Sequence, residues 1–222
     1  MERLLSSLRI SISDSVYLKD PETSALGKKI IEESILMIDT IGFEAFTFKK
    51  LGAQIGSNES SIYRYFENKH KLLLYLCSWY WGWLEYHMVL SCFSLKDPWE
   101  KLDKAVDIIS REVTEDSAFT FVNEPALHRI IINENAKSFL TKKVDEENKE
   151  GGFASYKRLV SRLNDMILEA APNYAYAKSL ATTVLETALH QYFIRDHFKS
   201  ITDAASPTPK PFLINLIHKT LS

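Results

Sequence analysis

The sequence predicts an all-α protein, and three observations support this prediction. Only seven glycines and seven prolines occur in 222 residues, which is few for a turn-rich all-β fold. No proline lies between Pro21 and Pro98, or between Pro125 and Pro172, so long segments are free of helix breakers. The sequence also has no alternating β pattern of useful length. We therefore expect a series of helices with prolines at the joints.

Composition and charge limit the class of protein. The chain has 27 Lys+Arg and 29 Asp+Glu, a net charge of −2, with 45% apolar residues, which argues against a disordered chain and against a polybasic one. Cys77 and Cys92 would stand about 22 Å apart on one helix, too far for a disulfide, so a reducing cytoplasm is the expected compartment. We expect no signal peptide after Met1. The most apolar run, Leu72–Leu84, is shorter than the ~20 residues of a membrane span.

The first clear helix is expected from Ser24 to Ile41, after a weakly patterned N-terminal arm at residues 1–22. Gly42 is expected to end this helix. One face of the helix repeats apolar or small residues at helical spacing, namely Ile30, Ser34, Met37, Ile38 and Ile41.

Two short helices follow, each with a local start signal. Thr47 suits the N-cap of a helix over Phe48–Ile55, which Gly56 would close. Asn58 suits the N-cap of a third helix running through Tyr65. A helix, a short helix, a glycine-bearing turn and another short helix form the pattern of a helix-turn-helix DNA reader.

The rest of the chain is expected to be helical as well. A long helix should run from Lys69, after the cap residue Asn68, to about Ser91. Residues 200–209 are expected to form a loop. Further helices are expected at about 98–114, 125–135, 138–171 with an interruption at Gly151-Gly152, 174–198 and 210–221.

The third helix carries the side chains that suit contact with DNA. Ser60 and Ser61 have short hydroxyl side chains, which would let the start of the helix approach a groove closely. Tyr63 and Arg64 could reach phosphates or base edges. Lys69 would place a cation beside the exposed N–H groups of the next helix, where phosphate binds readily.

Two runs of residues, in the same order, resemble the N-terminal domain of the tetracycline-repressor (TetR) family. The first covers residues 29–47 and ends in Gly42-Phe43-Glu44-Ala45-Phe46-Thr47. The second begins at Leu51-Gly52 and continues through Gly56-Ser57-Asn58 to Ser61-Ile62-Tyr63-Arg64-Tyr65-Phe66-Glu67-Asn68-Lys69 and Leu72-Leu73. The block of tyrosine, any residue, tyrosine and phenylalanine, with a lysine three residues later, is highly characteristic of that family.

The resemblance implies a homodimeric all-α transcription regulator that is not an enzyme and needs no cofactor. The implied domains are an arm (1–22), a three-helix DNA-binding domain (23–70) and a larger helical effector-binding and dimerisation domain (71–222). A repressor of this kind would leave a palindromic operator when a small apolar or amphipathic ligand binds. By position, Thr47, Tyr63 and Lys69 match phosphate contacts, while Ser57, Ser60, Ser61 and Arg64 match the residues nearest the bases.

The chain departs from the family pattern at Ile55, Ser57 and Glu59, and two alternatives stay open. Glu59 repels phosphates, and residues 24–73 hold seven Lys or Arg against six acids, a balance of 7 − 6 = +1. A TetR-like helical protein that binds a lipid-like ligand but no DNA is one alternative. A helical-bundle metalloenzyme is the other, although its Glu/His pairs, Glu124 with His128 and Glu186 with His190, lack the Glu-x-x-His spacing of di-iron bundles. We expect no metal site.

Ligand and dimer surfaces are also predicted. Trp79 and Trp83 share a helix face at i, i+4 and, with His87, could line an effector pocket. Core packing is the alternative for these side chains. Two apolar stripes predict a dimer interface, with burial inside one chain as the alternative. The stripes consist of Leu180, Val184, Ala188 and Tyr192, and of Phe212, Leu213, Leu216 and Ile217.

Overall fold

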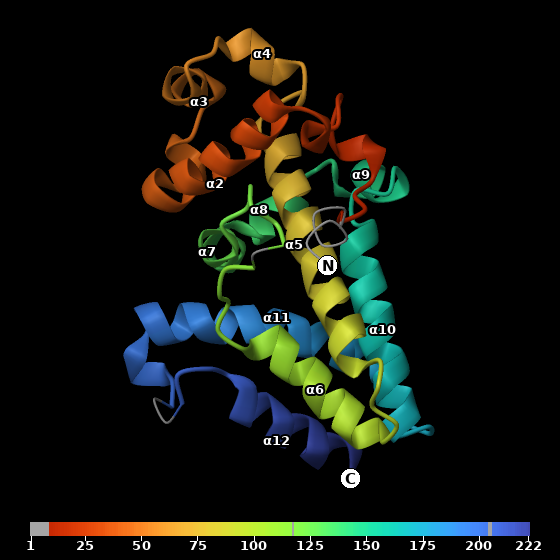
Figure 1. The fold of residues 1–222 in the computed structure, drawn as a ribbon. Helices are drawn as coiled ribbons and strands as arrows, with labels where there is room; N and C mark the ends of the chain where they lie inside the picture. Colours follow the sequence, from red (N-terminus) through yellow and green to blue (C-terminus); the bar gives the residue numbers. More distant parts are fainter. Residues whose placement is uncertain (1–8, 117, 204–205) are drawn as a thin grey trace. The chain divides into compact units, whose positions relative to one another are not determined.

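The computed structural model describes residues 9–116, 118–203 and 206–222. Every regular element in these ranges is helical, which confirms the predicted all-α fold (Figure 1). Two 3-10 turns, η1 (Asp14–Val16) and η2 (Pro21–Thr23), precede the first helix, and a third, η3 (Lys199–Ile201), lies near the C-terminus. The helices are α2 (Ala25–Ala45), α3 (Phe48–Ile55), α4 (Glu59–Tyr63), α5 (Lys69–Cys92), α6 (Pro98–Ser110), α7 (Glu124–Glu134), α8 (Ala136–Phe139), α9 (Val144–Lys149), α10 (Ala154–Ala170), α11 (Ala177–His197) and α12 (Lys210–Leu221).

The chain forms two compact units. The first comprises the chain up to Tyr80 together with Val113–Ala154, and the second comprises Trp81–Glu112 together with Ser155–Ser222. Helix α5 contributes its first half to one unit and its second half to the other. The expected functional domains, 1–22, 23–70 and 71–222, stay a prediction.

Helix α2 differs from the expected helix at its C-terminal end. Its N-cap is Ser24, whose hydroxyl accepts a hydrogen bond from the Gly27 amide at 3.1 Å. The sequence predicts that Gly42 ends the helix, but α2 continues to Ala45 beyond a local break at which Gly42 has φ 77°. The break frees the Phe43 amide, which donates to Glu134 Oε1 of α7 at 3.3 Å. A contact made far away in the sequence therefore helps α2 to continue.

Helices α3 and α4 follow the sequence signals closely and lie side by side in the first unit (Figure 1). The Thr47 hydroxyl accepts from the Lys50 amide at 3.2 Å, and Gly56 ends α3 in the left-handed conformation at φ 68°. Asn58 caps α4 by accepting from the Ser61 amide at 2.8 Å. The third helix was expected to reach Tyr65, but α4 ends at Tyr63.

The helix expected over 138–171 with an interruption at Gly151-Gly152 is confirmed after the interruption, where α10 lies, but two short helices replace its first part. Helices α8 and α9 are short, and α10 begins after Gly151, which has φ 89°. A side chain at Gly152 would meet the Glu147 carbonyl oxygen at 3.0 Å and a Leu74 methyl at 3.2 Å. The two glycines therefore allow a turn that packs closely against α5 and α9.

The second unit is built from α6, α10, α11, α12 and the second half of α5. Helix α6 ends at Ser110 rather than near Thr114, because the Ser110 hydroxyl turns back to the Val106 carbonyl at 2.6 Å and Arg111 is extended. The Tyr192 hydroxyl of α11 donates to the Ser110 carbonyl at 2.9 Å.

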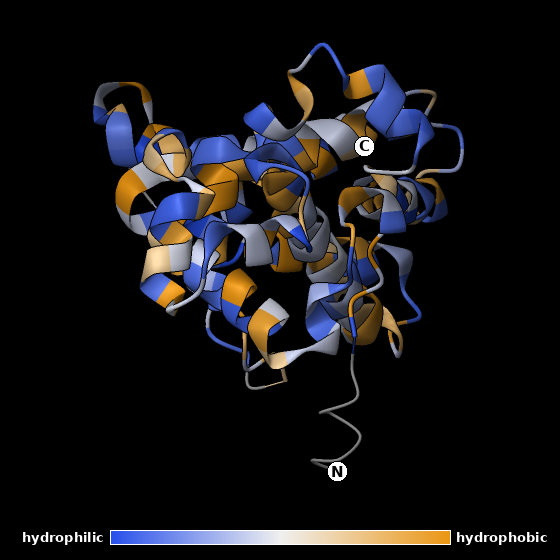
Figure 2. Ribbon diagram, turned by 90° about the horizontal axis from the view of Figure 1, so that it is seen from above, coloured by the Kyte–Doolittle hydropathy of each residue, from blue (hydrophilic) through white to orange (hydrophobic). Residues whose placement is uncertain are grey.

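Each unit has its own apolar interior. Ile30, Leu51 and Ile62 are fully buried in the first unit, as are Val106 and Leu213 in the second. The helices also carry hydrophilic residues along their lengths, as helices with one buried side do (Figure 2). Among the described helices, none is long and apolar enough to cross a membrane.

Candidate nucleic-acid interface

The turn between α3 and α4 is very closely packed. An added Cβ at Gly52 would lie 2.9 Å from the Ser57 carbonyl oxygen and 3.2 Å from the Glu59 amide nitrogen, and both of these are backbone atoms. The Ser57 amide also donates to the Gly52 carbonyl at 2.9 Å. Glycine at position 52 therefore fixes where the reading helix α4 begins.

Tyr63 is held on the surface of α4 by its neighbours. Its ring meets the buried ring of Phe48 edge-on at 5.0 Å between centroids, and 46% of the residue is exposed. Its hydroxyl lies 3.4 Å from Glu59 Oε1. An exposed, braced phenol of this kind is ready to donate to a phosphate, but in this structure it faces a carboxylate.

The hydroxyls predicted to lie near bases serve a structural purpose here. Ser60 and Ser61 both donate to Asn58 Oδ1 at 2.7 Å, so both take part in the cap of α4. Ser57 is partly exposed in the turn, and Arg64 is exposed at the C-terminal end of α4. The structure thus brings all four residues onto the same short segment.

The Lys69 ammonium donates to backbone carbonyls of its own chain. Its ammonium lies 3.0 Å from the Phe43 carbonyl oxygen and 3.2 Å from that of Glu44, at the C-terminal end of α2. It also sits 4.7 Å from the centre of the Phe43 ring. Helix C-termini attract cations because their last carbonyls lack partners. The sequence could not show this arrangement, because the carbonyls come from a helix 25 residues earlier.

Other cations of the first unit are held in similar ways. Lys29 donates to the Ile55 carbonyl at 3.1 Å and Lys50 to the Ala45 carbonyl at 2.7 Å. Lys71 pairs with Glu147 at 3.4 Å. These contacts therefore hold the three ammonium groups in fixed positions.

Two cations of α3 and α4 stay available. Lys49, at the start of α3, and Arg64, at the end of α4, are exposed, and their side chains make no hydrogen bond or ion pair with the described part of the chain. Sequence reasoning missed Lys49. Its position two residues after the N-cap Thr47, opposite the buried Phe48 and Leu51, was the signal that could have identified it.

Helix α7 holds α2 at its C-terminal end. Arg129 donates to both carboxylate oxygens of Asp39, at 2.9 and 2.7 Å. Lys137, which follows α7, pairs with Glu44 at 2.8 Å, and this contact lowers the pKa of the Glu44 carboxyl. Together with Glu134, which accepts from the Phe43 amide, these residues fix α2 on both sides of its break.

Two of the residues predicted to bind an effector, Trp79 and Trp83, are buried, and His87 is partly exposed. Trp79 is 1% exposed and meets Phe119 edge-on at 5.2 Å in the first unit. In the second unit, Trp83 is 3% exposed and packs against His87 at 4.6 Å. The three cavities described for the chain are lined by other residues. The effector site therefore stays a prediction.

Most of the residues predicted to form a dimer interface lie inside the second unit. Phe212 is half exposed and Leu216 is partly exposed, so only these two of the eight offer surface to a second chain. The others are buried in their own chain, which is the alternative that the sequence left open: Leu180, Val184, Ala188, Tyr192, Leu213 and Ile217.

The Glu/His pairs do not form a metal centre in the part of the chain that the structure describes. His128 Nδ1 lies 2.7 Å from the Tyr80 hydroxyl, and Glu186 accepts a hydrogen bond from Tyr156 at 2.7 Å. No group of three or more His, Cys, Asp or Glu side chains there is placed to hold a metal ion. The described residues thus give no support to the metalloenzyme alternative.

Comparison with known proteins finds a match within the first unit. Residues 30–76 match the family model for bacterial regulatory proteins of the tetR family. No curated protein sequence matches the chain.

Solved structures extend the likeness to most of the fold. The chain is similar to AibR in complex with isovaleryl coenzyme A and operator DNA (16% identity, TM-score 0.55, 86% of this chain and 96% of that one). It is also similar to the fatty acid degradation regulator FadR from Bacillus halodurans (16% identity, TM-score 0.59, 87% of this chain and 93% of that one). A third similar structure is the TetR family transcriptional regulator PfmR from Thermus thermophilus (16% identity, TM-score 0.56, 86% of this chain and 96% of that one). The helix-turn-helix segment thus matches the tetR family model, and most of the chain shares its helical fold with these three structures.

Proposed function

We propose that this protein is a DNA-binding transcriptional regulator, a repressor that leaves a palindromic operator when a small apolar or amphipathic ligand binds. The observation that carries the proposal is the first unit, in which capped helices α3 and α4 present Tyr63 and two available cations on one short segment. AibR, which shares the fold, has been solved with both a ligand and operator DNA. We expect the protein to act as a homodimer and to have no catalytic activity.

The side chains divide into two roles. Three residues would hold phosphates. Lys49 offers a cation, Thr47 lies at the start of α3, and Tyr63 offers an exposed phenol. Arg64 would contact base edges, together with the small side chains of Ser57, Ser60 and Ser61. Lys69 would act by holding α2 against the start of α5, not by touching DNA.

The effector is proposed to be an apolar or amphipathic molecule that binds beside α5. Trp79 and Trp83 of α5 are the residues that the sequence predicts for this apolar site. FadR is named a fatty acid degradation regulator and AibR was solved with isovaleryl coenzyme A, so an acyl chain is a reasonable first probe.

The experiment selects bound sequences from a randomised duplex library with the full chain and then titrates them at several salt concentrations. We expect a palindromic consensus. The Lys49→Ala variant should reduce the salt slope by about 1, and Arg64→Ala should relax base preference by ~1–3 kcal/mol. The matched control is Lys142→Ala, an exposed cation outside α3 and α4.

A second candidate is a TetR-like binding protein for a lipid-like ligand that has lost DNA binding. Glu59 favours it, because its carboxylate lies beside the Tyr63 hydroxyl on the reading helix and would repel phosphate. The same selection separates the two. If no duplex is enriched and no salt-dependent binding appears, the repressor proposal is wrong and the binding protein is favoured.

A further inference from the structure

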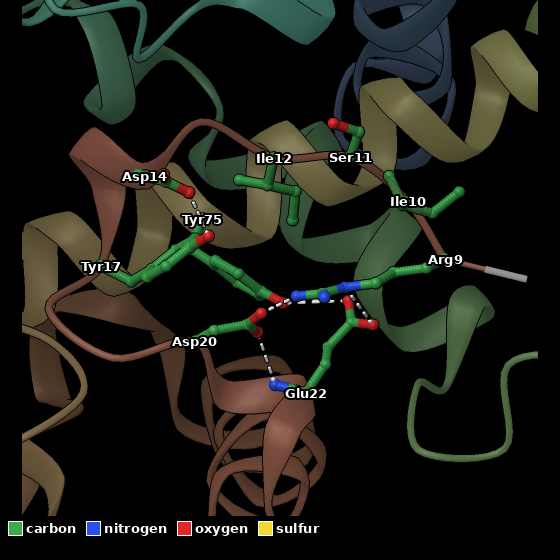
Figure 3. A pocket seen from close by; sticks show the side chains of 9 residues that line it. All are labelled: Arg9, Ile10, Ser11, Ile12, Asp14, Tyr17, Asp20, Glu22 and Tyr75. Atoms are coloured by element: carbon green, nitrogen blue, oxygen red, sulfur yellow. Dashed lines mark hydrogen bonds and ion pairs between the residues drawn. The ribbon is translucent and has the colours of Figure 1, made fainter. Parts of the chain in front are cut away.

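The N-terminal arm, described from residue 9 to residue 22, closes over a cavity of about 380 Å³ in the first unit (Figure 3). The polar side chains lining it are mostly acidic or phenolic: Asp14, Tyr17, Asp20, Glu22 and Tyr75, with Arg9 among them. In Figure 3 the Arg9 side chain reaches between the carboxylates of Asp20 and Glu22.

Arg9 supplies the positive charge of this cavity. It pairs with Asp20, and its Nε lies 3.5 Å from Glu22 Oε2. The Glu22 side chain is only 11% exposed and accepts a hydrogen bond from the Tyr75 hydroxyl at 3.2 Å. Burial raises the pKa of Glu22, and Arg9 opposes this rise. A buried carboxylate is costly without a counter-charge, so Arg9 is needed where it lies.

The other end of the arm is tied to the reading helix. The Leu18 amide donates to the Tyr65 carbonyl at 2.7 Å, and the Lys19 ammonium lies 5.1 Å above the Tyr65 ring. The Ser24 and Tyr65 hydroxyls are 2.8 Å apart. Tyr65 is buried and follows α4 by two residues. The arm therefore touches the C-terminal end of the element that would enter the DNA groove.

The arm has little freedom between these two ties. Val16 is fully buried, and an added Cβ at Gly27 would lie 2.1 Å from the Pro21 carbonyl oxygen, so η2 packs directly on α2. Movement of the arm must therefore begin upstream, at the Arg9 end.

We propose that the arm is a latch on the reading helix, closed by the Arg9 guanidinium in the acidic cavity, and that opening it weakens operator binding. Loss of the Arg9 pairs leaves Asp20 and Glu22 as adjacent carboxylates without their cation. Repulsion between these carboxylates then loosens η2, and Leu18, two residues before Asp20, loses the hydrogen bond to Tyr65 that steadies the end of α4. This inference goes beyond the proposed function and rests on it only for its effect on DNA.

The test measures amide hydrogen exchange at Leu18 in the full-length protein, followed by operator affinity. In Arg9→Ala we expect exchange at Leu18 to rise about tenfold or more, because charged hydrogen bonds are among the stronger ones. Arg9→Lys should lie between this variant and the wild type, since it keeps the charge but not the planar fork. Lys142→Ala, an exposed cation in the same unit, should leave exchange unchanged.

A second variant shows whether Glu22 is the partner. Glu22→Gln still accepts from Tyr75 but removes the charge, so its effect and that of Arg9→Ala should be less than additive in the double variant. Operator affinity should fall about threefold to tenfold in Arg9→Ala, because the end of α4 is no longer steadied when the latch is open.

Unchanged exchange at Leu18 in Arg9→Ala, or fully additive effects, would overturn the latch. Faster exchange with unchanged operator affinity would overturn its role in DNA binding. Exchange is measured without DNA, so failure of the latch is distinguishable from failure of the proposed function.

Discussion

Glu124 opens α7 with a carboxyl group that is 1% exposed. Its Oε2 accepts a hydrogen bond from the Asp116 amide at 3.2 Å, while Oε1 is buried with no hydrogen-bond partner among the described residues. Burial raises the pKa of Glu124 from its ordinary value of 4.5 to about 7. A buried carboxyl in this state prefers to keep its proton.

The stability of the protein should therefore depend on pH through Glu124. Between about pH 4.5 and pH 7 the folded chain holds a proton that the unfolded chain releases, so the free energy of unfolding falls as the pH rises. Above about pH 7 the free energy of unfolding has fallen by its full amount, of the order of 3 kcal/mol. Glu124→Gln keeps the acceptor for Asp116, so it should be more stable than the wild type at pH 8 but not at pH 4.

Urea unfolding at these two pH values measures the effect. Glu67→Gln, a change of an exposed carboxyl elsewhere in the first unit, is the control and should show no such difference. Equal stability of Glu124→Gln and the wild type at pH 8 would show that the Glu124 carboxyl has an ordinary pKa.

Lys69 and Lys49 form a matched pair of lysines with opposite expected behaviour. Lys69→Ala removes the cation from the last carbonyls of α2, so it should lower the free energy of unfolding by ~1–2 kcal/mol and leave the salt slope of DNA binding unchanged. Lys49→Ala should leave stability unchanged and lower the slope. Thermal unfolding and salt titration test both variants. A lower salt slope of DNA binding for Lys69→Ala would show that Lys69 contacts phosphate.

Sequence reasoning placed α3 and α4 well because their signals are local. Thr47, Gly56 and Asn58 make their capping contacts within three or four residues. It could not foresee that α2 continues past Gly42, because the amide freed there finds its partner in Glu134, 91 residues away. The carbonyl contacts of Lys69 could not be foreseen for the same reason, since they form with α2 only after folding.

The turn between α3 and α4 gives the clearest prediction for a helix pair. Gly52→Ala would press a methyl group against the backbone of Ser57 and Glu59, so α4 must shift or α3 must bend. We expect a loss of stability of ~1–3 kcal/mol together with weaker operator binding. Ala53→Ser, at the exposed neighbouring position, is the control. Unaltered melting and affinity in Gly52→Ala would mean that the turn has more room than the structure indicates.

Assembly concerns the chain as a whole. We expect a homodimer, and Leu216 and Phe212 are the predicted residues that still offer surface to a partner. Leu216→Glu should shift the protein toward monomers, because it places a charge in an apolar contact. Leu213→Ala is the control, since Leu213 is fully buried in its own chain and its loss should lower stability without changing the association state.

Sedimentation at several protein concentrations distinguishes the two variants. A dimer of wild-type strength in Leu216→Glu would place the interface on another surface. The apolar stripes correctly predict buried faces, but periodicity cannot say whether a face is covered by its own chain or by a second one. Leu180, Val184 and Ala188 show this directly, because α11 packs them inside the second unit.

The use of lysines as helix caps also affects how fast this protein could find DNA. Lys29, Lys50 and Lys69 hold their ammonium groups on backbone carbonyls of their own unit, and the six acids of residues 24–73 nearly balance the seven Lys and Arg there. Long-range attraction accelerates encounters when unpaired charge faces the partner, and it fades as salt rises. With a charge balance of only 7 − 6 = +1 over residues 24–73, we expect slow encounters whose rate depends only weakly on ionic strength. Most discrimination between sites would then appear in how long each complex lasts.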